Sequence, residues 1–585
     1  MRRDLQSMQN DSMIKGNKQT RGKAILEIKA AGQKSALLLV LLLILGFFCP
    51  LSMARYYLFN QDVLLLAAMV SVWTASSWYL GQRNAEIALS GWMVACIAGL
   101  TCVVGYVGHY LVLHGYALSR DEQMAVFDAQ IYASGRLSWP LPELWRHEPA
   151  VLNTTFMQSV TEPVGWVSAY LPGNAMLRAL VGKIADPALT GPLLSALGVV
   201  MTWLCARRLW PEEREPAAIA CLLVAFSGQL QITGMTSYAM PGHLALNMTW
   251  LWLFLRGRLT SDLAALGVGF VAVGLHQAVF HPLFVAPWLV LLLWRREWGR
   301  SALYTVSYVL IGLFWLLLWP SWQLATLTGS SSVISEIDSS LWAKVSAILA
   351  LNAGRLLIMP ANLLRFAVWQ PVALIPLALL GCTAIRRDPR VAALAGGFAL
   401  TTLAMTVLMA LQAHGFGYRY FHGLIGSAAL LAAFGWRELS SNRPQARLFL
   451  LRSLILGAIV TFPIQCWFGS SYYGVFANID RKAAASRADF VLIGTEDAPY
   501  SSDLVINKPD LSNRPLRLLP DLESNPVTLA KLICRPGVIV ALDGENLFRG
   551  VNEQLGMKAS KQRDNWAGEL TPALQAAGCI VTTLE

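Results

Sequence analysis

Long apolar runs separated by short polar stretches dominate this chain. A helix needs about 17 to 25 apolar residues to cross roughly 30 Å of hydrocarbon, at about 1.5 Å per residue. About thirteen runs approach this length, and we expect membrane helices near residues 35–53, 63–80, 88–113, 188–205, 216–234, 241–255, 262–280, 282–294, 302–320, 370–385, 391–411, 421–436 and 448–468. The pattern predicts an α-helical polytopic membrane protein.

Basic residues orient these helices. They fill the N-terminal tail, residues 1–34, and recur in every second loop after it, for example at Arg207 and Arg208, at Arg295 and Arg296, and at Arg386 and Arg387. Cytoplasmic loops of membrane proteins carry an excess of Lys and Arg. We therefore expect a cytoplasmic basic tail and, after an odd number of helices, a C-terminus outside.

Composition agrees with a membrane protein and excludes a soluble globular one. The 585 residues are 55% hydrophobic and 14% charged, and the mean hydropathy is +0.49. The net charge of +11 follows from the basic loops, so we expect no nucleic-acid partner. The first apolar run lacks the usual small-residue cleavage pattern, and we expect it to be a retained anchor.

The C-terminal region changes character. Apolar strings, DFVLIG, DLVIN and GVIVALDG, alternate with polar stretches and with expected helices near 543–555 and 567–577. This alternation predicts a small α/β domain outside the membrane over 470–585, after a transmembrane domain over 35–469. The string before Asp543 lacks the glycine spacing and lysine of a phosphate loop. We expect the domain to handle an acceptor or a partner rather than carry chemistry.

A tandem acid, Asp121-Glu122, follows the apolar run that ends near Leu113, in an outer loop that spans 114–187. Burying two adjacent carboxylates without partners is costly, so the pair indicates a site at the membrane surface. Met124, Phe127 and Ile131 recur at helical spacing, which predicts a short amphipathic helix lying along the membrane surface. An acidic pair that caps this helix is the alternative reading.

Three elements of the sequence resemble a known superfamily. A membrane helix is followed by Asp121-Glu122 and by a surface helix that ends at Gly135, ahead of Pro140. Tyr170-Leu171-Pro172-Gly173 precedes the next membrane helix, and Arg419-Tyr420 stands late in the chain within HGFGYRYFHG. Together they resemble the GT-C superfamily of polyprenyl-phosphate-sugar-dependent glycosyltransferases, in particular the lipid A aminoarabinose transferases and the protein O-mannosyltransferases. The resemblance covers roughly 90–470, but only as a hydrophobic pattern over 200–330.

The resemblance implies a reaction and residues for it. The chain would transfer a sugar, with inversion, from a polyprenyl-phosphate donor to a glycan, lipid or protein acceptor on the outer, periplasmic face. Asp121 would be the general base, and Glu122 a substitute base or a hydrogen-bonding partner. Arg419, Tyr420 and His414 would hold the donor phosphate, although aromatic anchoring at the membrane interface also explains them.

Other polar residues of the outer loops are candidates for the substrate cavity. We expect His243, His276, His281 and Glu162 to line it. The stretch HQAVFH lacks the spacing and the cysteine partners of a zinc site, so we expect no metal and no cofactor.

A membrane transporter or flippase of a lipid-linked substrate is the alternative function. Transporters place ionisable residues at mid-membrane and show repeated halves, and neither feature is evident here. A bacterial inner membrane, as part of the cell envelope, is the expected location, although an endoplasmic-reticulum membrane fits the same topology.

Two cysteines stand apart from those of the apolar helices. Cys534 and Cys579 both fall in the expected outer domain, where a disulfide can persist. Either they form a bridge or both remain buried thiols.

Overall fold

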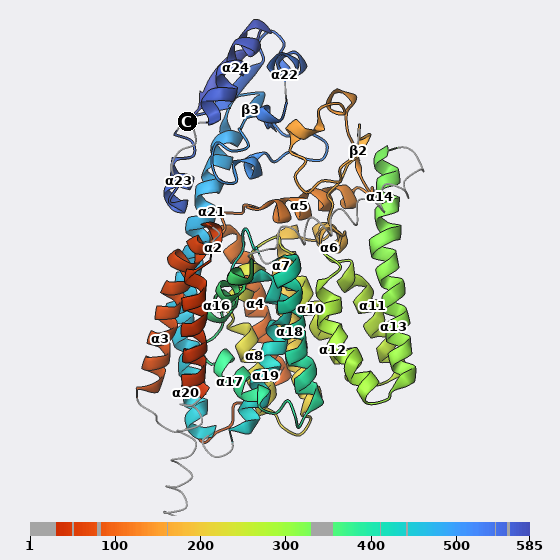
Figure 1. The fold of residues 1–585 in the computed structure, drawn as a ribbon, viewed down its shortest axis with the longest axis vertical. Helices are drawn as coiled ribbons and strands as arrows, with labels where there is room; N and C mark the ends of the chain where they lie inside the picture. The colour runs from red at the N-terminus through yellow and green to blue at the C-terminus, as the bar shows by residue number, and fades with distance from the viewer. Residues whose placement is uncertain are drawn as a thin grey trace, which may run out of the picture.

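The structure is a computed structural model, and it is mostly helical (Figure 1). It describes residues 31–49, 52–78, 83–160, 162–328, 355–409, 411–439, 443–523, 525–544, 546–557 and 562–585. A bundle of helices forms the lower part of the view, and a cap covers one end of it. The cap is built from the described parts of residues 114–187 and 486–585.

Six helices of the described residues are long and apolar enough to cross a membrane, or seven if one bent pair counts as a single span. The six are Met53–Ser77, Gly91–Leu111, Pro187–Leu209, Trp298–Thr328, Pro389–Leu408 and Arg443–Ala485. The bent pair is α8 (Glu215–Ala225) and α9 (Gly228–Gly234), which meet at 51°. These helices support the prediction that the chain is a multi-pass membrane protein.

The expected count of about thirteen spans is not confirmed, because several apolar runs form short helices. Over 241–255, 370–385 and 421–436 the structure has α10 (Met240–Phe254), α17 (Leu374–Cys382) and α19 (Ile425–Glu438). In α19 every residue from Ile425 to Trp436 is buried. An apolar run of this length is typical of a helix buried among other helices as well as of a membrane span.

The helices that make up these spans and the rest of the bundle follow the apolar runs. They are α3 (Val63–Ser77), α4 (Gly91–Leu111), α7 (Thr190–Leu209), α11 (Leu259–Val273), α12 (Phe280–Trp294), α13 (Trp298–Leu313), α14 (Trp319–Thr328), α16 (Ile358–Val368), α18 (Pro389–Leu408) and α20 (Arg443–Leu456), with an apolar helix at Ala31–Phe47 and the short α2 (Ser52–Tyr57).

Close packing in the bundle depends on small residues. A Cβ atom at Gly381 of α17 would lie 2.0 Å from the carbonyl oxygen of Leu431 in α19, and one at Gly435 would lie 1.9 Å from that of Leu377. Glycines at these two positions let the backbones of α17 and α19 approach, as in many helix pairs of membrane proteins.

The first part of the cap follows α4. It contains α5 (Arg120–Ala133), a two-stranded antiparallel sheet of β1 (Trp139–Pro140) and β2 (Gly165–Trp166), and α6 (Gly173–Gly182). The helix expected after the tandem acid exists, but nine of its fourteen residues are buried. It lies between the bundle and the C-terminal part of the cap (Figure 1), so it is a covered helix rather than one exposed along the membrane surface.

The second part of the cap is a four-stranded parallel sheet in the order β4-β3-β5-β6. The strands are β3 (Phe490–Leu492), β4 (Leu516–Leu518), β5 (Ile539–Asp543) and β6 (Ile580–Leu584), and the helices are α22 (Pro526–Ile533), α23 (Arg549–Leu555) and α24 (Gln562–Ala576). Two of the expected apolar strings form β3 and β5. The third, DLVIN (503–507), forms no strand: its first two residues end a short 3-10 helix, Ser501–Leu504, and the other three have no regular structure. Asp503 and Val505 instead contact α5 through their carbonyl oxygens.

Helix α21 (Phe462–Ala485) joins the bundle to this sheet. It continues α20 through a π-helical turn, Gly457–Thr461, and runs past residue 470 into the cap. The Cys534–Cys579 disulfide, with Cα atoms 5.2 Å apart, links the end of α22 to the residue before β6. The bridge expected between these cysteines is confirmed.

Candidate active site

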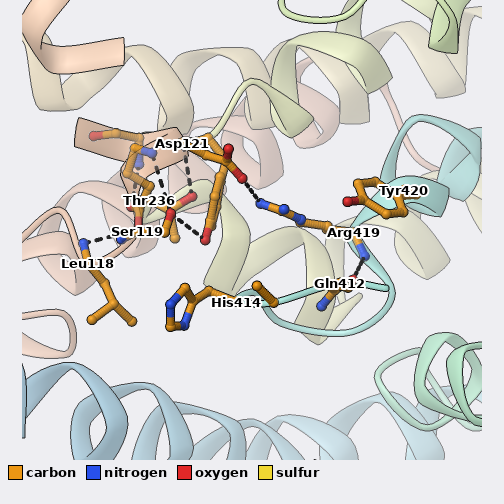
Figure 2. Close-up of polar contacts among 12 residues, drawn as sticks. Leu118, Ser119, Asp121, Thr236, Gln412, His414, Arg419 and Tyr420 are labelled. Atoms are coloured by element: carbon orange, nitrogen blue, oxygen red, sulfur yellow. Dashed lines mark hydrogen bonds and ion pairs between the residues drawn. The ribbon is translucent and has the colours of Figure 1, made fainter. Parts of the chain in front are cut away.

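Asp121 and Arg419 form a buried ion pair where the cap meets the bundle (Figure 2). Asp121 is the second residue of α5, and Arg419 opens a 3-10 helix, Arg419–Leu424, that leads into α19. Arg419 Nη1 donates a hydrogen bond to one carboxylate oxygen of Asp121, and the hydroxyl of Tyr170 donates to the other. The side chains of Asp121 and Arg419 are only 11% and 8% exposed.

These contacts keep Asp121 ionised. Burial by itself raises the pKa of a carboxyl group, but the charge of Arg419, together with the hydrogen bond from Tyr170, lowers the pKa of Asp121 to about 2. Burial, and then the negative charge of Asp121, raise the pKa of the Tyr170 hydroxyl. The site thus holds a carboxylate, a phenol and a guanidinium within direct contact.

Aromatic rings and an amide fix the position of Arg419. Its guanidinium lies 5.1 Å from the ring centre of Tyr238 and 5.3 Å from that of Tyr420. Its backbone N–H donates to Gln412 Oε1 at 2.7 Å (Figure 2). Tyr420 therefore supports the arginine by a cation–π contact, and its own ring stacks on Phe280.

Glu122 has a different environment from Asp121. Its carboxylate accepts hydrogen bonds from the backbone N–H groups of Leu118, Ser119 and Ser237 and from the hydroxyl of Tyr473, at 3.2, 3.4, 2.9 and 2.7 Å. With Ser119 it forms a capping box at the start of α5. Four donors saturate the carboxylate, so the geometry gives Glu122 a structural role. Glu122 therefore caps the helix, whereas Asp121 does not.

His276 packs against Tyr170, the tyrosine that contacts the pair. Its ring stacks on Tyr170, with ring centres 4.4 Å apart and planes inclined by 24°. Burial lowers its pKa to about 4, so the ring is neutral near pH 7. His276 thus helps to hold Tyr170 against Asp121.

His243 and His281 lie deeper, between α10 and α12. His281 is hydrogen-bonded on both ring nitrogens, to Asn247 and to Tyr308, which is the arrangement of a core histidine. His243 borders a small cavity of about 10 Å³ together with Arg419 and Tyr420. Within the described part of the chain neither ring nitrogen of His243 has a hydrogen-bond partner.

His414 and Glu162 lie elsewhere than expected. His414 Nδ1 is 2.9 Å from the hydroxyl of Tyr472, and the ring packs against Tyr500 with ring centres 4.2 Å apart. It therefore faces the C-terminal part of the cap rather than the guanidinium of Arg419. Glu162 is exposed, and its carboxylate lies 3.4 Å from His147 Nδ1 on the surface.

A short segment of the C-terminal cap, Tyr500–Val505, contacts both sides of the pair. The carbonyl oxygens of Asp503 and Val505 accept hydrogen bonds from Gln123 and Arg120 of α5, at 2.7 and 3.3 Å. On the other side, Tyr500 packs on His414, five residues before Arg419. We call Tyr500–Val505 the bridging segment.

Arg517 anchors the bridging segment to the rest of the cap. Its guanidinium donates to the carbonyl oxygen of Leu504 at 2.9 Å and to Asp480 Oδ1 of α21 at 2.6 Å. The position of Asp121 relative to Arg419 therefore depends on α21 and on the C-terminal sheet as well as on the bundle.

Sequence interpretation missed several contacts of the site. From the sequence, Tyr170 is assigned only to the stretch that precedes a membrane helix. No sequence motif includes Tyr238 or Gln412. Their contacts join segments far apart in the chain, such as those of Asp121 and Tyr170, which are separated by 49 positions. Among the residues that the structure describes, no group of three or more His, Cys, Asp or Glu side chains could hold a metal ion.

Comparison with known proteins gives structural similarities only. No family model matches the chain, and no curated protein matches it by sequence. Among solved structures it is similar to ArnT from Cupriavidus metallidurans bound to undecaprenyl phosphate, with 14% identity, a TM-score of 0.49, and coverage of 81% of this chain and 89% of that one. The apo state of the same protein gives 12% identity and a TM-score of 0.43, over 85% of this chain and 89% of that one.

A second similarity is to the apo oligosaccharyltransferase of Archaeoglobus fulgidus. It has 14% identity and a TM-score of 0.40, over 80% of this chain and 64% of that one. ArnT, an aminoarabinose transferase, and this oligosaccharyltransferase are members of the GT-C superfamily. At these TM-scores the likeness decides nothing about activity, and a functional proposal depends on the geometry of the site.

Proposed function

We propose that the chain is a membrane glycosyltransferase of the GT-C type, which transfers a sugar from a polyprenyl-phosphate donor to an acceptor hydroxyl on the outer face. The observation that carries the proposal is the contact between Asp121 and Arg419 where cap and bundle meet. A carboxylate that can take a proton and a cation that can hold a phosphate are the two groups such a transfer requires.

In the proposed reaction the acceptor hydroxyl gives its proton to Asp121 while its oxygen attacks the anomeric carbon of the sugar. The bond between this carbon and the phosphate oxygen breaks, and its electron pair stays on the phosphate. Arg419 binds the phosphate and stabilises the charge that develops on it. Attack from the side opposite the leaving phosphate inverts the anomeric carbon.

The ion pair in the structure is the resting arrangement of this mechanism. A carboxylate with a pKa of about 2 is a weak base. A donor phosphate competes with Asp121 for Arg419, and loss of that contact raises the pKa of Asp121 towards its ordinary range. Donor binding thereby strengthens the base next to the acceptor.

Transfer of radiolabelled sugar from polyprenyl-phosphate donors to a membrane extract tests the proposal. Asp121→Asn is compared with the parent protein and with Glu143→Gln, a change in an exposed acid of the same outer loop. We expect the rate to fall by about 10² to 10⁴ in Asp121→Asn and to stay unchanged in Glu143→Gln. Thermal unfolding of each variant checks that the fold is retained.

Two results would contradict the proposal. Equal transfer by the parent and by Asp121→Asn would remove Asp121 from the mechanism. Absence of transfer from every donor would favour the transport of a lipid-linked substrate.

A further inference from the structure

A large groove lies between α12 and α18, at the ends of these helices that point away from the candidate active site. Its volume is about 530 Å³, which is within the usual range of ligand sites. Pro287, Val290 and Trp294 of α12 form one wall, and Pro389, Ala392 and Gly396 of α18 form the other. The walls are apolar, and Val290 and Trp294 are 63% and 70% exposed.

The ends of the two helices define the orientation of the groove. Helix α12 begins with Phe280, whose ring stacks on Tyr420 beside the ion pair, and ends at Trp294. Helix α18 begins with Pro389 and leads back towards the loop that carries Arg419. The groove is therefore at the opposite end of the bundle from the cap, where the basic loops lie.

Arginines stand at the mouth of this groove. Arg386 and Arg387 line it directly, and Arg295 and Arg296 follow Trp294 and are exposed. Arg387 is paired with Glu438 at 2.9 Å. In the described part of the structure Arg386 makes neither an ion pair nor a hydrogen bond, so its charge is available to a ligand.

We infer that this groove binds an anionic glycerophospholipid, with an acyl chain along the apolar walls and the phosphate at Arg386. Two observations support this occupant over an uncharged one. The walls accept a hydrocarbon chain, and the charge at the mouth is positive, which complements a phosphodiester. Trp294 at the rim is an aromatic side chain of the kind found at membrane interfaces.

The experiment measures lipid bound to the purified full-length protein by native mass spectrometry. Phosphatidylglycerol and phosphatidylcholine with the same acyl chains are added at equal concentration to the parent and to three variants. Arg386→Gln removes the free charge, Ala392→Phe fills the groove, and Arg258→Gln removes an exposed arginine, outside the groove, that precedes α11 in a basic loop.

We expect the parent and Arg258→Gln to bind phosphatidylglycerol in preference to phosphatidylcholine. In Arg386→Gln the preference should fall about fivefold, which is the effect of one basic side chain near a membrane surface. In Ala392→Phe binding of both lipids at this site should be lost.

The inference is overturned if Arg386→Gln keeps the preference of Arg258→Gln, or if the parent binds both lipids equally. Since Arg386 is exposed, its variant remains informative even where Ala392→Phe fails to fold. The measurement does not use sugar transfer, so its outcome is independent of the proposed enzyme activity.

Discussion

Asp121 and Glu122 are neighbours in the chain, but their side chains contact different groups. Successive residues of a helix point about 100° apart, so two adjacent acids at the start of α5 face different surroundings. Glu122, at the third helical position, turns back onto the N-terminus of its own helix. Asp121 points to Tyr170 and Arg419.

Glu122→Gln should destabilise the protein rather than abolish chemistry directly. The amide keeps one acceptor oxygen and presents an NH₂ group to backbone N–H donors, so buried donors lose their partner. We expect a loss of about 0.5 to 2 kcal/mol in the free energy of unfolding, as for other capping residues. Thermal unfolding measures it, and an unchanged unfolding temperature would show that the cap is dispensable.

Asp128 should make stability depend on pH. It is buried in α5, where its carboxyl accepts hydrogen bonds from the N–H and the hydroxyl of Ser168, and burial raises its pKa to about 7 from an ordinary 3.8. The folded protein holds this proton more tightly than the unfolded chain. The stabilisation is therefore fully present below about pH 4 and is lost as the pH rises through about 7.

Asp128→Asn removes this titration while it keeps the shape of the side chain. We expect the unfolding temperature of the parent to fall, relative to that of Asp128→Asn, as the pH is raised from 4 to 8. Thermal unfolding scans across this range provide the measurement. Parallel curves for the two proteins would rule out a buried, proton-holding Asp128.

At the scale of elements, the bridging segment Tyr500–Val505 connects two parts of the site that the bundle alone does not fix. It contacts α5 through Gln123 and the loop before Arg419 through His414. Because carboxylate and guanidinium must stay close to the reacting atoms, a small displacement of either is expected to reduce the rate.

Arg517→Gln tests the bridging segment. It removes the contact to Leu504 and the ion pair with Asp480, and we expect sugar transfer to slow about tenfold, mainly in kcat. Arg535→Gln is the matched control, because this arginine of the same sheet domain donates hydrogen bonds to the carbonyl oxygens of Lys531 and Cys534 at the end of its own helix. Equal rates for both variants would show that the segment does not position the pair.

The Cys534–Cys579 disulfide stabilises the sheet domain by closing a segment of 45 residues. We expect the double change to Ser to lower the free energy of unfolding by about 2 to 4 kcal/mol. The unfolding temperature of the parent should fall in reductant, whereas that of the variant should not. Cys96→Ser, in α4, serves as the control because this cysteine is free.

At the scale of the whole molecule, the two ends of the bundle differ in charge and in covering. One end carries the cap and the ion pair. The other end carries the arginine-rich loops and the groove between α12 and α18. The positive-inside rule predicts from these basic loops that the cap is outside.

Reporter fusions can test this orientation. Alkaline phosphatase fused after Glu585 should be active, because it folds only outside the cytoplasm, and the same enzyme fused after Arg258 should be inactive. The reverse pattern would place the cap in the cytoplasm and would contradict transfer at the outer face.

Several features of this protein can be predicted from local sequence pattern. Apolar runs and basic loops indicated a multi-pass protein, and the strings at 489–494 and 537–544 predicted strands that the structure contains. The tandem acid and Arg419-Tyr420 are the two sequence motifs whose residues Asp121 and Arg419 form the ion pair of the candidate site. Each of these predictions depends only on residues close together in the chain, so hydropathy and residue spacing are sufficient to make it.

Which of these residues lie in contact follows from the packing of distant segments. Only packing shows that Glu122 is saturated by donors, that His414 faces the C-terminal cap, and that Tyr170 reaches Asp121. Hydropathy also does not distinguish a membrane span from a buried helix, because a helix buried among other helices is as apolar as one in lipid. The partners of a side chain are set by contacts between distant segments, and no local pattern encodes them.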